Sequence, residues 1–183
     1  MASESTGGST SVDTDLIIIG AGPTGLYATY YAGFRGLRVA VVDSLPELGG
    51  QITAMYPEKA ILDVAGFPTV KGRDLVAGLV AQAATAAPAY FLERTALSLE
   101  EAEDSVTVGL DDGTRITGRA LLVTAGIGKF SPRPLPVGED WLGRGMEFFV
   151  PSFEPYVGKD VVIVGGHGVL RAQLRAVRRQ GRR

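Results

Sequence analysis

The feature that most constrains this chain is a glycine-rich turn between an apolar run and a helical stretch. Gly20, Gly22 and Gly25 have the spacing GxGxxG within "LIIIGAGPTGLYATYYAGFRGL". The run before them, residues 16–19, is β-branched and apolar, which is typical of a strand buried on both faces. Residues 26–35 after them have helical composition. A strand, a glycine turn and a helix in this order predict a dinucleotide-binding βαβ unit, whereas the spacing alone is a weak signal.

Each glycine has its own expected task. Gly20 makes the tight turn, Gly22 lets the backbone approach a diphosphate, and Gly25 lets the helix pack closely on the strand. Pro23 stands at the helix start, where its missing N–H does no harm. The helix N-terminus then presents N–H groups to the anion.

A second apolar run, residues 39–42, ends in Asp43, about 20 residues after the first glycine. A carboxylate at this place bonds ribose hydroxyls and repels a 2′-phosphate. The residues therefore predict FAD or NAD at this first site, and exclude NADP there.

After Asp43 the strand-helix alternation of a simple dehydrogenase is not expected to continue. A long loop with "GGQ" leads to a helical stretch, residues 72–86, and then to three short alternating runs that predict a small antiparallel meander. The runs are residues 95–100, 105–110 and 114–117, and a buried strand follows at 120–124. The expected fold class is α/β, a doubly wound FAD-binding Rossmann-like domain with a small antiparallel β-meander.

These stretches resemble a known family. "VVDSLPELGGQITAMYPEKAILDVAGFP", "VTAGIGKFSPRPL" and "VGKDVVIVGG", with the first glycine loop, are similar to the ferredoxin/flavodoxin NADP reductases of the thioredoxin-reductase-like type. The resemblance runs from about residue 15 to residue 166. It favours FAD over NAD at the first site. The alternative is a plain NAD-binding module, against which "GGQITAMY" and the meander argue.

The resemblance also implies roles for single residues. Gly20, Gly22, Thr24 and Gly25 would hold the diphosphate and Asp43 the adenosine ribose. Close backbone at Gly50, the Gln51 amide and the Tyr56 ring would contact the flavin, which suits a planar ring with polar edges. Ala96 would lie near the adenine and Phe130 near the flavin. The alternative for Tyr56 is a half-buried core tyrosine, and for Gln51 a surface amide.

The implied chemistry is hydride transfer from NADPH to the flavin and electron transfer to ferredoxin or flavodoxin, with no catalytic side chain needed. Thioredoxin reductases are the nearest rival, but they need a CxxC pair. This chain has no cysteine, so it lacks the nucleophile for dithiol exchange.

The second nucleotide loop departs from the family pattern. Residues 161–164 are expected as its strand, and Gly165 and Gly166 as the opening of its turn, but His167 stands where a third glycine is usual. The run from 167 to 183 is rich in arginine and free of acid. We therefore expect an incomplete NADPH site in a truncated or frameshifted chain, and a noncatalytic remnant is the alternative function.

The expected organisation is a disordered tail at 1–14, the N-terminal part of the FAD-binding domain at 15–137, and a linker with the start of an NAD(P)H-binding domain at 138–183. The basic C-terminal run lacks interleaved aromatic residues, so nucleic acid is not expected as a partner. No apolar stretch is long enough for a membrane helix. A cytoplasmic location fits, and the sequence leaves a homodimer open.

Overall fold

The computed structural model describes residues 10–128, 132–150 and 152–164. Its contacts divide the chain into two compact units. The first unit joins the part of the chain up to Gly50 to residues 76–130, and the second contains residues 51–75 and those from Ser131 on. The expected boundary between residues 137 and 138 stays a prediction.

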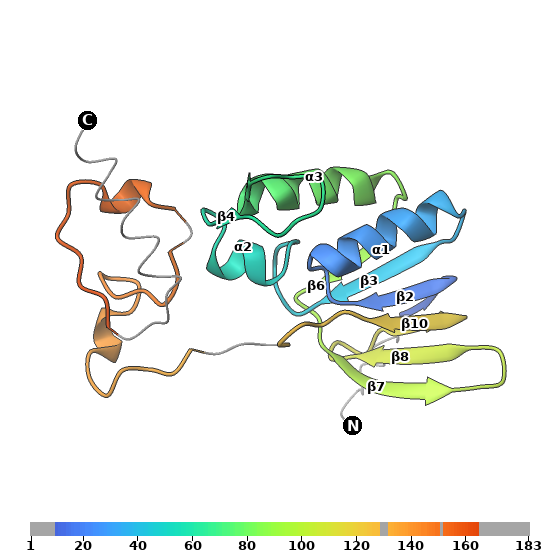
Figure 1. Ribbon diagram of the computed structural model, residues 1–183. Coiled ribbons are helices and arrows are strands. Elements are labelled where there is room, and N and C mark those ends of the chain that lie inside the picture. The colour runs from blue at the N-terminus through green and yellow to red at the C-terminus, as the bar shows by residue number, and fades with distance from the viewer. Residues whose placement is uncertain (1–9, 129–131, 151, 165–183) are drawn as a thin grey trace, which may run out of the picture. The chain divides into compact units, whose positions relative to one another are not determined.

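A parallel sheet of four strands is the centre of the first unit (Figure 1). It contains β2 (Leu16–Ile19), β3 (Val39–Asp43), β6 (Ala89–Leu92) and β10 (Ala120–Val123), in the spatial order β10-β2-β3-β6. Numbered by their appearance in the chain, these strands lie in the order 4-1-2-3, which read from the other edge is the 3-2-1-4 of dinucleotide-binding folds. The α/β fold class expected from the sequence is confirmed.

Helices cover one face of this sheet. α1 (Pro23–Phe34) follows β2, and α3 (Gly72–Ala84) precedes β6, its residues from Val76 on belonging to the first unit. Ile18, Val39 and Val41 point from the sheet into a buried cluster with Ala21 and Ala32 of the loop and α1. The run at residues 16–19 is buried on this face through Ile18 and on the other face through Ile17, as its composition predicts.

The meander covers the other face. β7 (Ala96–Glu101), β8 (Val106–Leu110) and β9 (Arg115–Gly118) pair antiparallel in sequence order, close to the predicted bounds. Val108, Leu110 and Ile116 pack from it against Ile17, Ala40 and Val42 of the parallel sheet. Figure 1 shows the resulting layers, with α1 and α3 on one side of the sheet and β7 and β8 on the other.

The predicted tail at residues 1–14 was wrong at its C-terminal end. β1 (Ser11–Asp13) pairs parallel with β9, Ser11 opposite Arg115. Val12 is the one apolar residue of this segment, and three residues are too few for a strand pattern, so the open edge of β9 decides their conformation. Residues 1–9 lie outside the described part.

The predicted end of the strand-helix alternation after Asp43 was also wrong. β6 pairs parallel with β3 along residues 89–92 and extends the sheet by one strand. Its sequence "AYFL" is a short apolar run after a proline, which alone does not distinguish a strand from a loop.

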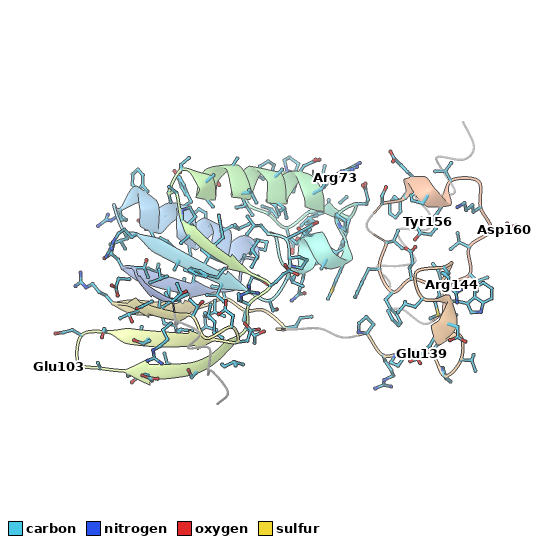
Figure 2. All side chains as sticks on the ribbon, turned by 180° about the vertical axis from the view of Figure 1, so that it is seen from behind. Arg73, Glu103, Glu139, Arg144, Tyr156 and Asp160 are labelled. Carbon is cyan, nitrogen blue, oxygen red and sulfur yellow. The ribbon has the colours of Figure 1, made fainter. Side chains whose placement is uncertain are left out.

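The second unit contains α2 (Gln51–Met55) and a short hairpin of β4 (Ala60–Ile61) and β5 (Val70–Lys71). The "GGQ" loop therefore leads into one helical turn that the sequence did not predict. The Glu58 carboxylate accepts from Arg73 at 2.8 Å and lies 3.5 Å from the Lys71 ammonium. Figure 2 shows Arg73 at the start of α3.

Residues 132–164 contain two short 3-10 helices, η1 (Glu139–Trp141) and η2 (Glu154–Tyr156). The Tyr156 hydroxyl donates to the Glu147 carboxylate, and this hydrogen bond raises the pKa of Tyr156 to about 12. Figure 2 labels Tyr156 and Arg144 in this segment. The strand expected at residues 161–164 is absent from the described structure, because no neighbouring strand pairs with it there.

No helix in the described ranges has the length and apolar character that a membrane span requires.

Candidate dinucleotide-binding site

The glycine loop begins where β2 ends and meets the end of β10. Gly20 has φ +107°, a left-handed conformation that L side chains rarely adopt. A Cβ on Gly20 would lie 2.5 Å from the Thr124 carbonyl oxygen. Both the backbone angle and the lack of space for a side chain require glycine at this position. The tight turn predicted for Gly20 is confirmed.

Gly25 lies at the point where α1 crosses the end of β2. A Cβ there would be 1.9 Å from the Gly20 carbonyl oxygen and 2.8 Å from Thr124 Oγ1. No side chain fits this gap, which confirms the close packing of helix on strand predicted for Gly25.

Gly22 differs from both, because a Cβ on it would meet nothing within 4 Å. Its backbone, φ −71° and ψ −177°, suits any residue. No side chain caps the helix here, and the first helical hydrogen bond runs from the Leu26 amide to Gly22 O at 2.9 Å. The amides of Thr24 and Gly25 precede that bond in the first turn. The backbone at this end of α1 is therefore open in the manner that an anion at a helix N-terminus requires.

A second pair of glycines passes beside this open backbone. Gly49 N–H donates to Ala21 O at 2.8 Å. Gly50 has φ +58°, and a Cβ on it would lie 2.9 Å from the Gly22 Cα. The two glycine stretches, which are separate in the sequence, form one cradle of main chain.

Asp43 ends β3 next to this loop. Its Oδ2 accepts from the Ala21 amide at 2.6 Å and its Oδ1 from the Leu45 amide at 2.9 Å. Each carboxylate oxygen has a second lone pair that these bonds leave for another donor. The carboxylate thus braces the loop and can also accept from a ribose hydroxyl.

The end of β6 lies beside Asp43. Arg94 N–H donates to Asp43 O at 3.0 Å, and the Arg94 guanidinium pairs with Asp112 at 2.7 Å. The Thr114 amide bonded to Asp112 lowers the pKa of that carboxyl below its usual range, and Arg94 adds to the effect. Ala96 starts β7 two residues after Arg94. It therefore follows closely the residue whose amide is hydrogen-bonded to Asp43.

Gln51 and Tyr56 belong to the second unit. Gln51 begins α2, and Tyr56 N–H donates to Ile52 O at 3.2 Å just after that helix ends. Both side chains are half-buried, and the Lys59 ammonium lies 5.4 Å from the centre of the Tyr56 ring. Their predicted contact with a flavin stays a prediction.

Three predicted site residues, Phe130, Gly165 and Gly166, lie outside the described residues. The structure also brings in a residue that the sequence reasoning did not select, Thr124, which hydrogen-bonds the loop. It follows the β10 run directly in "LLVTAG", but no spacing rule in the sequence connects it to Gly20.

A cavity of about 470 Å³ opens at the other end of the parallel sheet, between Gly33, Arg38 and Ala86. It lies at the amino ends of β3 and β6, with Val39 and Ala89 in its lining. Ligands of open α/β sheets bind outside the carboxyl ends of the strands, so this cavity is not the candidate dinucleotide site.

Known proteins are similar to this chain over most of its length. Residues 18–66 match the family described as NAD(P)-binding Rossmann-like domain. The chain is 76% identical over 160 residues to a ferredoxin–NADP reductase of Nocardioides sp. (strain JS614), covering 85% of this chain and 48% of that protein. It is 48% identical over 155 residues to a ferredoxin–NADP reductase of Thermus thermophilus, covering 84% and 46%.

Solved structures show the same fold at lower identity. The T. acidophilum thioredoxin reductase aligns with a TM-score of 0.57 at 22% identity, covering 73% of this chain and 41% of that one. The thioredoxin reductase from Streptococcus pyogenes MGAS5005 aligns with a TM-score of 0.56 at 23% identity, covering 73% and 42%. The chain spans about half the length of the curated relatives it matches. The resemblance to ferredoxin–NADP reductases that the sequence indicates is confirmed, and this chain is similar to about half of such a protein.

Proposed function

We propose that this chain binds FAD at its glycine loop and serves as the flavin-binding part of an NADPH-dependent oxidoreductase that passes electrons to ferredoxin or flavodoxin. The name shared by the curated relatives supports the activity. The observation that carries the binding proposal is the open backbone at Gly22, where a side chain would touch nothing in the described protein.

The residues of the first unit fit the adenosine diphosphate half of FAD. The helix start at Gly22, Thr24 and Gly25 offers amide hydrogens to the diphosphate, and Gly20 sets their direction. Asp43 accepts from a ribose hydroxyl with the lone pairs left by its two backbone bonds. No acidic side chain other than Asp43 is hydrogen-bonded to this loop in the described part of the chain.

The residues of the second half of the site are proposed from the resemblance. The Gln51 amide supplies a hydrogen-bond donor and an acceptor for the polar edge of the flavin. The Tyr56 ring supplies an aromatic face that stacks on the flavin ring. Ala96 lies by the adenine and Phe130 by the flavin. When bound, FAD supplies the capacity to accept a hydride and to release single electrons, so the protein needs only to bind and orient it.

NADPH is the proposed reductant, with Gly165 and Gly166 in its site. Two other functions compete with the proposal. A thioredoxin-reductase-like activity requires redox cysteines, and the sequence has none. A noncatalytic chain would bind FAD weakly or not at all.

The test starts with the purified chain and FAD. Quenching of flavin fluorescence on titration, with retention of the yellow colour after gel filtration, is the expected result, and NAD at the same concentration should not displace the flavin. A colourless chain would contradict FAD binding. Anaerobic bleaching by NADPH then tests the NADPH step separately, since a yellow chain that does not bleach retains the flavin site alone. The homodimer and the cytoplasmic location stay predictions.

A further inference from the structure

Thr124 is hydrogen-bonded through its amide and its hydroxyl to the end of β2 and to Gly20 after it. Its amide donates to Ile19 O at 2.7 Å, and its hydroxyl lies 2.9 Å from Gly20 O and 3.1 Å from Ile19 O. The two segments are 104 residues apart in the chain.

This contact lies where the strand order of the parallel sheet reverses. β2 has β3 on one side and β10 on the other. The chain leaves β2 through α1 to its neighbour β3, whereas it reaches β10 only after β6 and the meander, so the next strand is added on the opposite side of β2. Thr124 follows β10 at its carboxyl end, and Gly20 follows β2 at the same edge. The hydroxyl therefore acts at the place in the sheet where a dinucleotide is expected.

The Gly20–Ala21 peptide is held from both ends. Its carbonyl accepts from the Thr124 hydroxyl at 2.9 Å, and its N–H donates to Asp43 at 2.6 Å. Rotation of this peptide would break both bonds at once. Its plane sets the direction of the chain into Gly22 and thus of the amides that follow in α1.

Thr124 also fits against the two glycines that the loop requires. Its carbonyl oxygen would be 2.5 Å from a Cβ on Gly20, and its hydroxyl 2.8 Å from a Cβ on Gly25. The residue thus contacts the loop by hydrogen bond and by close packing, from a segment outside the βαβ unit.

We propose that Thr124 is a positioning residue for dinucleotide binding, its hydroxyl fixing the Gly20–Ala21 peptide so that the first turn of α1 points at the diphosphate. The inference rests on the proposed function, since the ligand is the FAD assigned there. Thr124 acts through the loop and not by touching the cofactor.

The decisive variant is Thr124→Val, which keeps the shape and replaces the hydroxyl by a methyl group. A carbon cannot approach a carbonyl oxygen to 2.9 Å, because such contacts lie at about 3.3–3.6 Å. The peptide must shift, and the FAD dissociation constant should rise about tenfold, the equivalent of about 1.4 kcal/mol. Thr124→Ser keeps the hydroxyl and should restore the dissociation constant to within about threefold of the unchanged chain.

A matched control comes from the meander. Thr107 and Thr117 form a hydroxyl pair at 2.9 Å, also partly buried and in the same unit. Thr107→Val removes a comparable hydrogen bond away from the loop. We expect it to lower the thermal midpoint by a similar amount and to leave the FAD dissociation constant unchanged.

The outcomes separate the two proposals. If the unchanged chain does not bind FAD, the proposed function fails and the loop must be tested with ADP alone. If the unchanged chain binds and Thr124→Val binds equally well, or if Thr124→Ser fails to rescue, the positioning role is overturned. A loss of thermal stability in Thr124→Val without a loss of affinity overturns it as well.

A measurement on the unchanged chain covers the case in which Thr124→Val does not fold. Titration with ADP, followed by amide NMR, should shift the signals of Gly22, Thr24 and Gly25 and also that of Thr124. Loop signals that shift while Thr124 stays unmoved would contradict coupling between this residue and the diphosphate.

Discussion

The Asp43 carboxylate accepts a hydrogen bond from the Ala21 amide at 2.6 Å, which joins the end of β3 to the glycine loop 22 residues earlier. The same carboxylate accepts from the Leu45 amide at 2.9 Å through its other oxygen. Charge-assisted bonds of this kind are stronger than neutral ones. Asp43 thus shapes the loop before any ligand is present, in addition to the ribose role that the sequence predicts for it.

Asp43→Asn should therefore weaken both the fold and the site. The amide has one acceptor oxygen in place of two, so one of the two backbone donors faces an NH₂ group and is left without an acceptor. We expect a loss of about 1–3 kcal/mol in the free energy of unfolding, measured by urea denaturation, together with weaker FAD binding. Asp63→Asn, which changes an exposed residue of the second unit, is the control and should alter neither. An unchanged urea midpoint in Asp43→Asn would contradict the bracing role.

Most of the parallel sheet was predictable because its signals are local. The run at residues 16–19 is apolar throughout, and the glycines after it are needed by φ angles and contacts that any βαβ unit repeats. The meander was predictable for a similar reason, since alternation and the turn at "DDG" mark its strands. The same reasoning identified Gly20, Gly25 and Asp43.

The missed elements depend on distant partners. β1 is a strand only because β9 offers an open edge, and β6 only because β3 does. Residues 161–164 are an apolar run with a strand pattern, but they are not a strand in the described structure because no described strand pairs with them. Thr124 was missed for the same physical reason, because its partner lies 104 residues away and no spacing rule connects them.

Tyr56→Leu should reduce flavin binding if the ring stacks as proposed. An aromatic contact adds about 0.5–1.5 kcal/mol beyond its buried area, so the FAD dissociation constant should rise by roughly three- to tenfold. Bound FAD should also fluoresce more, because a stacked tyrosine quenches flavin emission. Tyr31→Leu, which changes a tyrosine of α1 that is 51% exposed, is the control for loss of a ring. Equal quenching in Tyr56→Leu and the unchanged chain would place the flavin elsewhere.

Acid should destabilise the meander through its exposed ion pairs. The Arg115 guanidinium bonded to Glu100 lowers the pKa of that carboxyl, and the Thr114 amide lowers the pKa of Asp112. A carboxyl whose pKa is lower in the folded than in the unfolded chain stabilises the fold above its unfolded pKa, and this contribution is lost as the pH falls through the folded pKa. These two groups should therefore make the urea midpoint fall as the pH is lowered below about 4.5. Between about pH 5 and pH 7 they should leave the urea midpoint unchanged.

Glu100→Gln tests this assignment. It removes one of the titrating groups, so the fall of the urea midpoint with acid should be shallower, and moderate salt should narrow the difference because both partners are exposed. Glu101→Gln is the control, since Glu101 is exposed and has no ion pair in the described ranges. A steeper acid slope in Glu100→Gln would mean that the folded chain does not lower the pKa of Glu100.

Gly22 and Gly25 should differ in their effect on stability when each is changed, which separates binding from folding within one motif. Gly22 is at the helix N-cap with an extended backbone and open space, so Gly22→Ser introduces a residue that N-caps accept at least as well. The free energy of unfolding should change by less than about 0.5 kcal/mol. FAD affinity should nevertheless fall at least tenfold, because the serine hydroxyl bonds a first-turn amide and its Cβ occupies the space left for the diphosphate.

Gly25→Ala should lower the free energy of unfolding, which Gly22→Ser leaves nearly unchanged. Its Cβ would lie 1.9 Å from the Gly20 carbonyl oxygen, so the helix must move away from the strand. Alanine gains about 1 kcal/mol in helix propensity over glycine, but the clash exceeds this gain, and we expect a net loss of at least about 2 kcal/mol. Urea denaturation and FAD titration of both variants give the comparison. If Gly22→Ser binds FAD as the unchanged chain does, the diphosphate does not contact this turn, whereas a stable Gly25→Ala would contradict the close packing itself.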